Sequence, residues 1–374
     1  MFLRRRISGF IIFTICVMMV GYIGIWGGRK VLHQWAAMSF FPGLTYLNSN
    51  QGGNDYTGWL VEQIFPLYHY VNANAPKETK VEDSLTYEML LAEQARDEEK
   101  ISEDLTTQTA EAPPTAQVSN VDMSMEKLRD FNYLISKFYT VDSTTTIGAN
   151  QLNVDDLLGR NMKINQSSNG PKVLIFHTHS QEAFADSKAG DASTSIVGMG
   201  KHLSEQLNAL GIETLHHTGV YDLINGKLDR SKAYQQAEVG VKEILNQYPS
   251  IEVVIDLHRD GVPETTHLVT EIDGKQVAKI MYFNGLCRTK SNGDLTSMPN
   301  PYIQDNLALS LQMQLESEKQ FSGFTRRIYL KGYRYNMHLM PKTLLIEAGA
   351  QTNTVEEVKN AMDLLAKILS KVLL

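Results

Sequence analysis

Cysteine is scarce in this chain of 374 residues, which has only two. Cys16 lies in an apolar N-terminal run, so Cys287 has no evident disulfide partner. A zinc site built from several thiolates is therefore excluded, and any metal site must use histidine and carboxylate ligands. Internal repeats are absent as well, which excludes a repeat architecture.

Basic clusters are also missing. The formal net charge is −7 at pH 7, and no stretch of lysine and arginine reaches the density that nucleic-acid partners require. Residues 75–112 hold eleven acidic and four basic side chains, a difference equal to the net charge of the whole chain. The acidic excess thus belongs to one segment, and we expect no nucleic-acid partner.

One long uncharged run lies near the N-terminus. Arg4–Arg6 precede Ile7–Trp26, twenty residues whose helix would be about 30 Å long, the thickness of a bilayer core. A cleaved signal peptide would have a shorter apolar region of about 7–15 residues. Tyr22 and Trp26 near the exit suit a membrane interface. We therefore expect a single-pass anchor over residues 1–27, with a cytoplasmic N-terminus and the rest of the chain outside the membrane.

The remaining chain divides by composition. We expect residues 28–128 to form an extracytoplasmic juxtamembrane region and an acidic, flexible tether that contains "TTQTAEAPPTAQVSN". From residue 129 onward, apolar runs alternate with segments of helical spacing. This alternation predicts an α/β fold over residues 129–374, a layered α/β/α domain with a mostly parallel sheet.

Individual elements follow from the local pattern. A hairpin is expected across Asp273-Gly274, and Ser231 is the expected N-cap of one helix. The expected strands cover residues 138–147, 162–164, 172–177, 212–218, 251–258, 266–272, 275–284, 326–335 and 343–349, and the expected helices cover 194–209, 230–248, 302–320 and 355–374.

Three apolar strands end in ionisable residues: "VLIFHTH", "VVIDLH" and "LLIE". In open α/β sheets the functional site lies beyond the carboxyl ends of the strands, so these three ends are expected to converge. A single histidine at a strand end is usually structural, but three coincidences favour a site. The groups collected in this way are His177, His179, Glu182, Asp256, His258 and Glu347.

Two imidazoles and one carboxylate form the ligand set of a catalytic zinc site with one open position. His179 and Glu182 have H-x-x-E spacing, and His258 from another strand completes the set. His177 is an alternative to His179, or a group that supports a ligand or contacts substrate. Asp256, on the same strand face as His258, is expected to orient an imidazole, although a simple strand-end hydrogen bond explains it equally well. The pattern predicts hydrolysis by activated water with a further carboxylate as base.

Four segments carry a family resemblance. "PKVLIFHTHSQEAF", "IDLHRDG", "YNMHLMP" and "LLIEAGAQTNTVEE" resemble the stage II sporulation protein P family, which is related to zinc-dependent N-acetylmuramoyl-L-alanine amidases. The resemblance covers roughly residues 130–374. In the wider amidase family the last strand carries a catalytic glutamate, then glycine two, asparagine six and glutamate nine residues later. Glu347, Gly349, Asn353 and Glu356 match this pattern.

The same resemblance assigns two histidine ligands and leaves the carboxylate ligand open. The family histidine after the first strand corresponds to His179, and the later strand-end histidine corresponds to His258. The amidases place their glutamate ligand more than three residues from the first histidine, so Glu205 and Glu213 are alternatives to Glu182.

The resemblance also implies an activity and partners. It implies Zn²⁺ as cofactor, Glu347 as the catalytic residue, and cleavage of the N-acetylmuramoyl-L-alanine amide of peptidoglycan, with endopeptidase activity on stem-peptide crosslinks. The implied partners are a lytic transglycosylase and a membrane protein that act with it in engulfment during sporulation. Arg259 is expected to support the site or to contact stem-peptide carboxylates.

Two other functions fit the same residues. One is a non-catalytic wall-binding scaffold that kept the fold, and the other is a zinc carboxypeptidase on stem peptides, suggested by the H-x-x-E spacing. The products distinguish them, because an amidase releases stem peptides, a carboxypeptidase releases single residues and a scaffold releases nothing.

Overall fold

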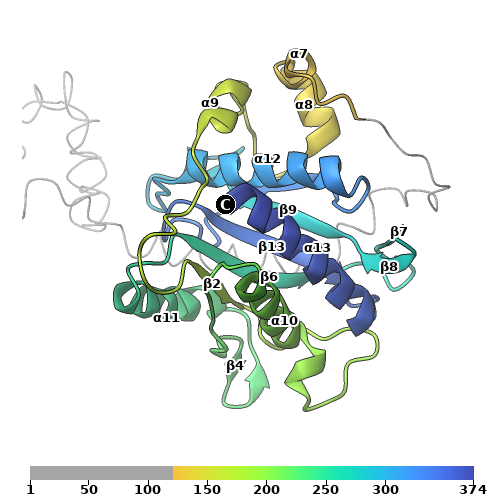
Figure 1. Cartoon of the computed structure of the whole chain (residues 1–374). Coiled ribbons are helices and arrows are strands. Elements are labelled where there is room, and N and C mark those ends of the chain that lie inside the picture. The colour runs from red at the N-terminus through yellow and green to blue at the C-terminus, as the bar shows by residue number, and fades with distance from the viewer. Residues whose placement is uncertain (1–120) are drawn as a thin grey trace, which may run out of the picture. The chain divides into compact units, whose positions relative to one another are not determined.

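The structure is a computed structural model, and it describes residues 121–374 (Figure 1). The predicted membrane anchor over residues 1–27 lies outside the described residues, as does the predicted region 28–128 up to residue 120. Within residues 121–374, no helix combines the length and the apolar character that a membrane crossing requires.

A seven-stranded sheet forms the centre of the described domain. Its strand order is β1-β12-β9-β13-β6-β2-β3, and every neighbouring pair is parallel except β9 and β13. The predicted α/β fold with a mostly parallel sheet is thus confirmed. The strands are β1 (Tyr139–Val141), β2 (Val173–Phe176), β3 (Thr214–His216), β6 (Val253–Asp260), β9 (Ile280–Gly285), β12 (Ile328–Lys331) and β13 (Thr343–Ala350).

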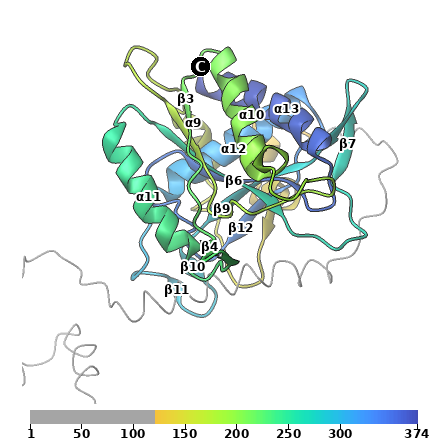
Figure 2. The same ribbon diagram turned by 90° about the horizontal axis from the view of Figure 1, so that it is seen from below.

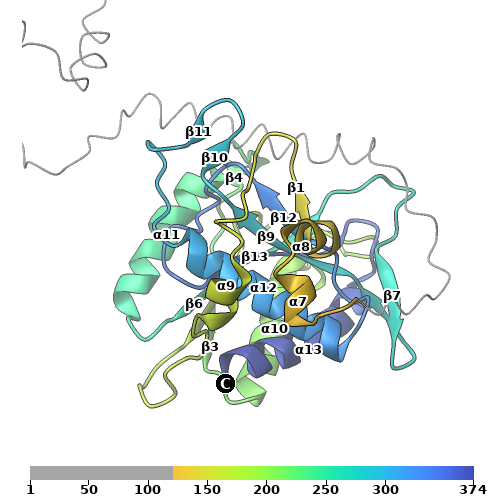
Figure 3. The ribbon, with the colours of Figure 1, turned by 90° about the horizontal axis from the view of Figure 1, so that it is seen from above.

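Helices cover the two faces of the sheet unequally. Figure 2 shows α10 and α13 side by side, with α11 set apart from them. The helices α7, α8 and α9 lie on the same side as α12 (Figure 3). One face of the sheet is covered by α11 (Ala233–Gln247). The other face is covered by six helices: α7 (Met125–Leu128), α8 (Phe131–Phe138), α9 (Val154–Gly159), α10 (Ile196–Ala209), α12 (Ile303–Gln320) and α13 (Val355–Leu373).

The alternation of side chains along each strand explains this division. Ile175 and Leu257 belong to the large core cluster that contains α10, α12 and α13, whereas Phe176 and Val254 pack with α11. Because successive side chains of a strand point to opposite faces, every second residue of β2 and β6 shares one environment. Both faces of these strands are buried, as expected for a parallel sheet between helices.

Cap residues fix where the helices begin. The Ser195 hydroxyl accepts from the backbone N–H of Val197 at the start of α10. At the start of α13, Thr354 and Glu357 form a reciprocal capping box. Each such cap contributes about 1 kcal/mol to helix stability.

Three local predictions need correction or refinement. Residues 162–164 form no strand, because the segment packs against the end of α13 through a single bond from Ile164 N–H to the carbonyl of Leu373. Ser231 is not the cap of α11, since Lys232 takes that place and the Ser231 hydroxyl bonds to Asp229. The strand predicted over residues 275–284 is broken at its middle.

The predicted hairpin itself is confirmed. It joins β7 (Val269–Ile272) to β8 (Lys275–Ala278) through Asp273 and Gly274, which have φ of 52° and 75°. At Lys279 the chain leaves the hairpin and enters the main sheet as β9. Three short elements complete the fold: η1 (Ala192–Thr194), the pair β4 (Leu223–Ile224) and β5 (Lys227–Leu228), and the pair β10 (Arg288–Thr289) and β11 (Gly293–Asp294).

Candidate metal centre

The carboxyl ends of β2, β6 and β13 meet at one edge of the sheet. In the parallel register Phe176 lies opposite Asp256, and His258 lies opposite Glu347. Parallel partners point to the same face, so Asp256, His258 and Glu347 all lie on the α11 face. The convergence expected from the three strand ends is therefore present in the fold.

His179, Glu182 and His258 lie together at this edge. Each offers one ligand atom, and the three atoms lie within 4.8 Å of one another. Nδ1 of His179 is 3.6 Å from Oε1 of Glu182, and Nδ1 of His258 is 3.9 Å from Oε2. The donors of a tetrahedral zinc site are about 3.4 Å apart, so these separations fit one small ion with little adjustment. All three side chains are buried.

Glu182 is held as a carboxylate. The backbone N–H of Arg259 donates to its Oε2 at 2.9 Å, and the guanidinium of Arg230 lies 3.4 Å from Oε1. Burial raises the pKa of Glu182, but the hydrogen bond with His179 and the charge of His258 outweigh burial and lower the pKa to about 2. The ionised form is the one in which the Glu182 carboxylate can bind a divalent cation.

The loop between His179 and Glu182 is fixed by a residue that the sequence analysis missed. Asp222 is fully buried, and its carboxylate accepts from the Ser180 hydroxyl at 2.8 Å and from the Gln181 N–H at 3.0 Å. Asp222 lies in a segment without apolar periodicity, so nothing local indicated that it folds back onto this loop.

Asp256 contacts His258 and the residue before His179. Its Oδ1 is 2.8 Å from Nε2 of His258, and its two oxygens accept from the N–H and hydroxyl of Thr178 at 2.9 and 2.6 Å. Burial lowers the pKa of His258, but the charges of Asp256 and Glu182 outweigh burial and raise it to about 10. Asp256 thus fixes the ring orientation that turns Nδ1 of His258 toward Glu182.

His177 lies on the opposite face of the sheet. Its Nδ1 donates to the carbonyl of Leu257 at 2.7 Å, so its Nε2 accepts from Nε2 of His216 at 2.9 Å. Gly200 of α10 lies directly against both rings, because an added Cβ would be 2.5 Å from Nε2 of His177. Burial is the main cause that lowers the pKa of both imidazoles to about 4. The structure does not bring His177 to the His179–Glu182–His258 group.

Glu347 borders the group on β13. It is partly buried, and its Oε2 is buried without a hydrogen-bond partner within residues 121–374. Burial, together with the charge of Asp260, raises the pKa of Glu347 well above its usual range. Asp260 forms an ion pair with Arg326. Burial and a neighbouring negative charge therefore both favour the protonated form of Glu347.

The remaining predicted site residues are Arg259, Glu205 and Glu213, and none of them is a member of the His179–Glu182–His258 group. The Arg259 guanidinium donates to the carbonyls of Ala183 and Asp260 at 2.7 and 3.0 Å, so it ties the Glu182 loop to β6. Glu205 is exposed on α10 and pairs with Lys201 at 3.8 Å. Glu213 is exposed next to β3. Neither of these two glutamates joins the histidines.

Comparisons with known proteins identify the family of this chain. The family model for stage II sporulation protein P matches residues 56–370. This chain belongs to that family. Stage II sporulation protein P of Bacillus subtilis (strain 168) is 25% identical over 214 residues, which cover 53% of this chain and 50% of that protein. The chain thus spans about half the length of the curated relative it matches.

Solved structures of amidases also match this chain, with low sequence identity. The CwlD amidase of Clostridioides difficile in complex with the GerS lipoprotein is 15% identical, with a TM-score of 0.34, and the match covers 54% of this chain and 98% of that one. The N-acetylmuramyl-L-alanine amidase Ami1 of Mycobacterium smegmatis is 12% identical, with a TM-score of 0.35, over 57% of this chain and 98% of that one.

The residues that follow Glu347 shape the turn into α13. Gly349 has a φ of 64°, and a Cβ there would lie 2.9 Å from Oδ1 of Asn353. The buried Asn353 amide accepts from the Ala350 N–H at 2.9 Å and donates to the Leu268 carbonyl at 3.0 Å. Glu356 is exposed. Gly349 and Asn353 therefore hold the end of the strand that carries Glu347.

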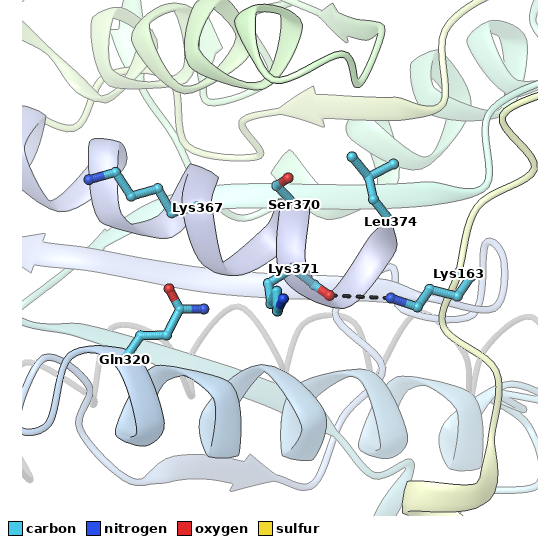
Figure 4. A pocket seen from close by; sticks show the side chains of 6 residues that line it. All are labelled: Lys163, Gln320, Lys367, Ser370, Lys371 and Leu374. Carbon is cyan, nitrogen blue, oxygen red and sulfur yellow. Dashed lines mark hydrogen bonds between the residues drawn. The ribbon is translucent and has the colours of Figure 1, made fainter.

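A cavity of about 390 Å³ lies elsewhere, between α12 and α13 (Figure 4). The Lys163 ammonium donates to the Lys371 carbonyl at 3.3 Å across its rim. These helices cover the face opposite the His179–Glu182–His258 group, so the cavity is separate from it. Its lining residues are Lys163, Gln320, Lys367, Ser370, Lys371 and Leu374.

Proposed function

We propose that this protein is a membrane-anchored, zinc-dependent peptidoglycan hydrolase that cleaves the amide between N-acetylmuramic acid and L-alanine during sporulation engulfment. Endopeptidase activity on stem-peptide crosslinks belongs to the same proposal. The observation that carries it is the buried group His179, Glu182 and His258 beside Glu347, in a chain of the stage II sporulation protein P family.

His179, Glu182 and His258 would hold the zinc ion. The donor set of two imidazoles and a carboxylate fits this metal, and so do the separations of the three atoms. Bound zinc supplies Lewis-acid chemistry, which polarises the scissile carbonyl and makes water more acidic. Asp256 keeps the His258 ring turned, and Arg259 and Asp222 hold the loop that carries Glu182.

Glu347 moves the proton in this proposal. Its Oε2 takes a proton from the attacking water as the oxygen bonds to the lactyl carbonyl carbon. The same carboxyl then gives this proton to the alanine nitrogen when the carbon–nitrogen bond breaks. The products are a muramic acid carboxylate and a stem peptide with a free amine. The position of Glu347 supports this role, because the register of β13 and β6 places it opposite His258 of the proposed metal site.

The location of the domain is part of the proposal. The uncharged run Ile7–Trp26 after Arg4–Arg6 supports an anchor over residues 1–27 with a cytoplasmic N-terminus. Residues 28–128 would then act as the extracytoplasmic region and tether of a catalytic domain over residues 129–374. The family membership supports a lytic transglycosylase and a membrane protein as partners in engulfment.

The test uses the full chain in detergent, incubated with purified cell walls with and without a zinc chelator, and mass analysis of the released fragments. We expect stem peptides that begin with a free L-alanine amine, and we expect the chelator to stop their release. Absence of these peptides at every zinc concentration would contradict the proposal.

A zinc carboxypeptidase acting on stem peptides is the second candidate. Such an enzyme needs a cation for the terminal carboxylate, and Arg230 lies 3.4 Å from Glu182. Single amino acids in the same mass analysis would identify this activity.

A further inference from the structure

We infer that Arg230 binds a substrate carboxylate that lies within one or two residues of the scissile amide. This inference rests on the proposed function. No motif singled out Arg230 in the sequence, and it enters the site only because the segment of β4 and β5 folds back onto the Glu182 loop.

The backbone around Arg230 is fixed from both sides. Asp229 N–H donates to the Asp222 carbonyl at 2.9 Å, and Ala233 N–H donates to the Arg230 carbonyl at 3.1 Å. Asp222 in turn bonds to the loop between His179 and Glu182. Asp222 therefore links the backbone next to Arg230 to the loop that carries His179 and Glu182.

The guanidinium of Arg230 has unused hydrogen-bond donors. Its single carboxylate contact, from Nη2 to Oε1 of Glu182, is long at 3.4 Å. Its Nε is buried and makes no hydrogen bond to any described residue. The side chain as a whole is 32% exposed, so Arg230 is accessible from solvent although its Nε is buried. A guanidinium has five N–H donors in a fork that matches a carboxylate.

Three other arginines, Arg259, Arg326 and Arg334, already bind groups of the protein. The Arg259 guanidinium donates to two backbone carbonyls, and Arg326 pairs with Asp260. Arg334 is buried against Glu238. Compared with these, Arg230 has the donors that a substrate carboxylate requires.

The distance between Arg230 and the proposed metal site indicates which carboxylate of the substrate Arg230 would bind. A ligand oxygen lies about 2 Å from zinc, so the Arg230 nitrogen that is 3.4 Å from Glu182 would lie no more than about 5 Å from the bound metal. One residue of extended chain spans about 3.5 Å. In a stem peptide the matching group is the α-carboxylate of the D-glutamate that follows L-alanine.

The test compares two soluble muramoyl tripeptides that differ only in this α-carboxylate, which is free in one and amidated in the other. Binding is measured by calorimetry with zinc, using the full chain in detergent with Glu347→Gln to prevent turnover. We expect Arg230→Gln to weaken binding of the free-carboxylate peptide by about tenfold to a hundredfold and to leave the amidated peptide within about threefold. Arg230→Lys should restore part of the affinity. Arg129→Gln, at a surface ion pair with Asp155, is the matched control.

Zinc content, measured on the same samples, distinguishes binding of the substrate carboxylate by Arg230 from a role of Arg230 in holding Glu182 as a zinc ligand. Equal loss of both peptides together with lost zinc overturns the inference, as does a parent protein that binds both peptides equally. Cleavage by the chain with native Glu347 is scored separately. If neither peptide is cleaved but Arg230→Gln abolishes the binding preference, the proposed reaction fails and the inference about Arg230 stands.

Discussion

At the scale of single residues, the site depends on which carboxyl groups are ionised. Glu182 is ionised and lies between two imidazoles, whereas the pKa of Glu347 is raised by burial and by Asp260. In the proposed reaction these two carboxyls take different roles, Glu182 as ligand and Glu347 as proton carrier, as expected where the surroundings move two pKa values apart.

Replacement of Glu347 by glutamine should keep zinc and lose activity. The side chain keeps its size but no longer takes a proton, so release of stem peptides should fall by about 10²–10⁴-fold. The check is fragment release together with zinc content by elemental analysis. Glu126→Gln, on an exposed side chain of α7, is the control and should release peptides normally. Undiminished release by the Glu347 variant would remove the proton-carrying role.

Replacement of Asp222 by asparagine should weaken zinc binding. Asparagine has one neutral acceptor oxygen where the carboxylate has two charged ones, so the Ser180 hydroxyl and the Gln181 N–H can no longer both donate to a charged group. We expect a loss of about 10–100-fold in zinc affinity, measured by competition with a chromophoric chelator. Asp294→Asn, at an exposed ion pair with Arg288, should leave the affinity unchanged. Equal affinities for the two variants would show that Asp222 has no part in holding the ligand.

The sequence could identify some site residues and not others for physical reasons. His179, His258 and Glu347 follow apolar strands, and the carboxyl ends of parallel strands share one edge, so their proximity was predictable. His177 and His179 would share one face of an extended strand, so the choice against His177 depended on the chain leaving β2 after Phe176, which the apolar pattern did not mark. Asp222 and Arg230 reach the site through a fold-back that leaves no periodic signal.

At the scale of elements, α10 is fitted to the His177–His216 pair. Gly200 occupies the point of closest approach, where an added Cβ would also lie 2.7 Å from Nε2 of His216. Helix glycine is normally a cost of about 1 kcal/mol relative to alanine. Here the absence of a side chain allows the helix to pack on two imidazoles.

Gly200→Ala should therefore destabilise the domain by about 1–3 kcal/mol despite its better helix propensity, because the rings must move in a closely packed core. Urea unfolding followed by circular dichroism measures the change. Gly159→Ala in α9 is the matched control, since nothing lies within 4 Å of its added Cβ, and it should be neutral or stabilising. A Gly200 variant as stable as the control would show that α10 tolerates a displacement.

Strand breaks were the least predictable element boundaries. Residues 275–284 form one apolar, strand-like run in the sequence, yet Lys279 N–H donates to Leu268 while β9 continues into the main sheet. The break depends on tertiary pairing with β13, which no local propensity encodes.

At the scale of the whole molecule, the proposed metal links segments that are distant in sequence. His179 and Glu182 come from the loop after β2, and His258 comes from β6. Buried carboxylates at this edge repel one another unless a cation offsets their charge.

Chelation should therefore lower the thermal stability of the full chain. A ligand that binds only the folded state contributes about 2.7 kcal/mol at a concentration one hundred times its dissociation constant. Differential scanning fluorimetry with and without chelator measures this shift. A double variant, His179→Ala with His258→Ala, should show no shift. A chelator effect of equal size in this variant would mean that the stabilising ion binds elsewhere.

The opposite orientations of His177 and His179 have an evolutionary consequence. Deleting a single residue within β2 would exchange the sides of the sheet on which all later side chains of that strand emerge, because the repeat is two residues. The His177 imidazole, which now lies against α10, would then face α11, and Gly200 would meet a different group. Length changes in descendants of this chain should therefore accumulate in the connection between Glu182 and α10 and be purged from the four-residue strand.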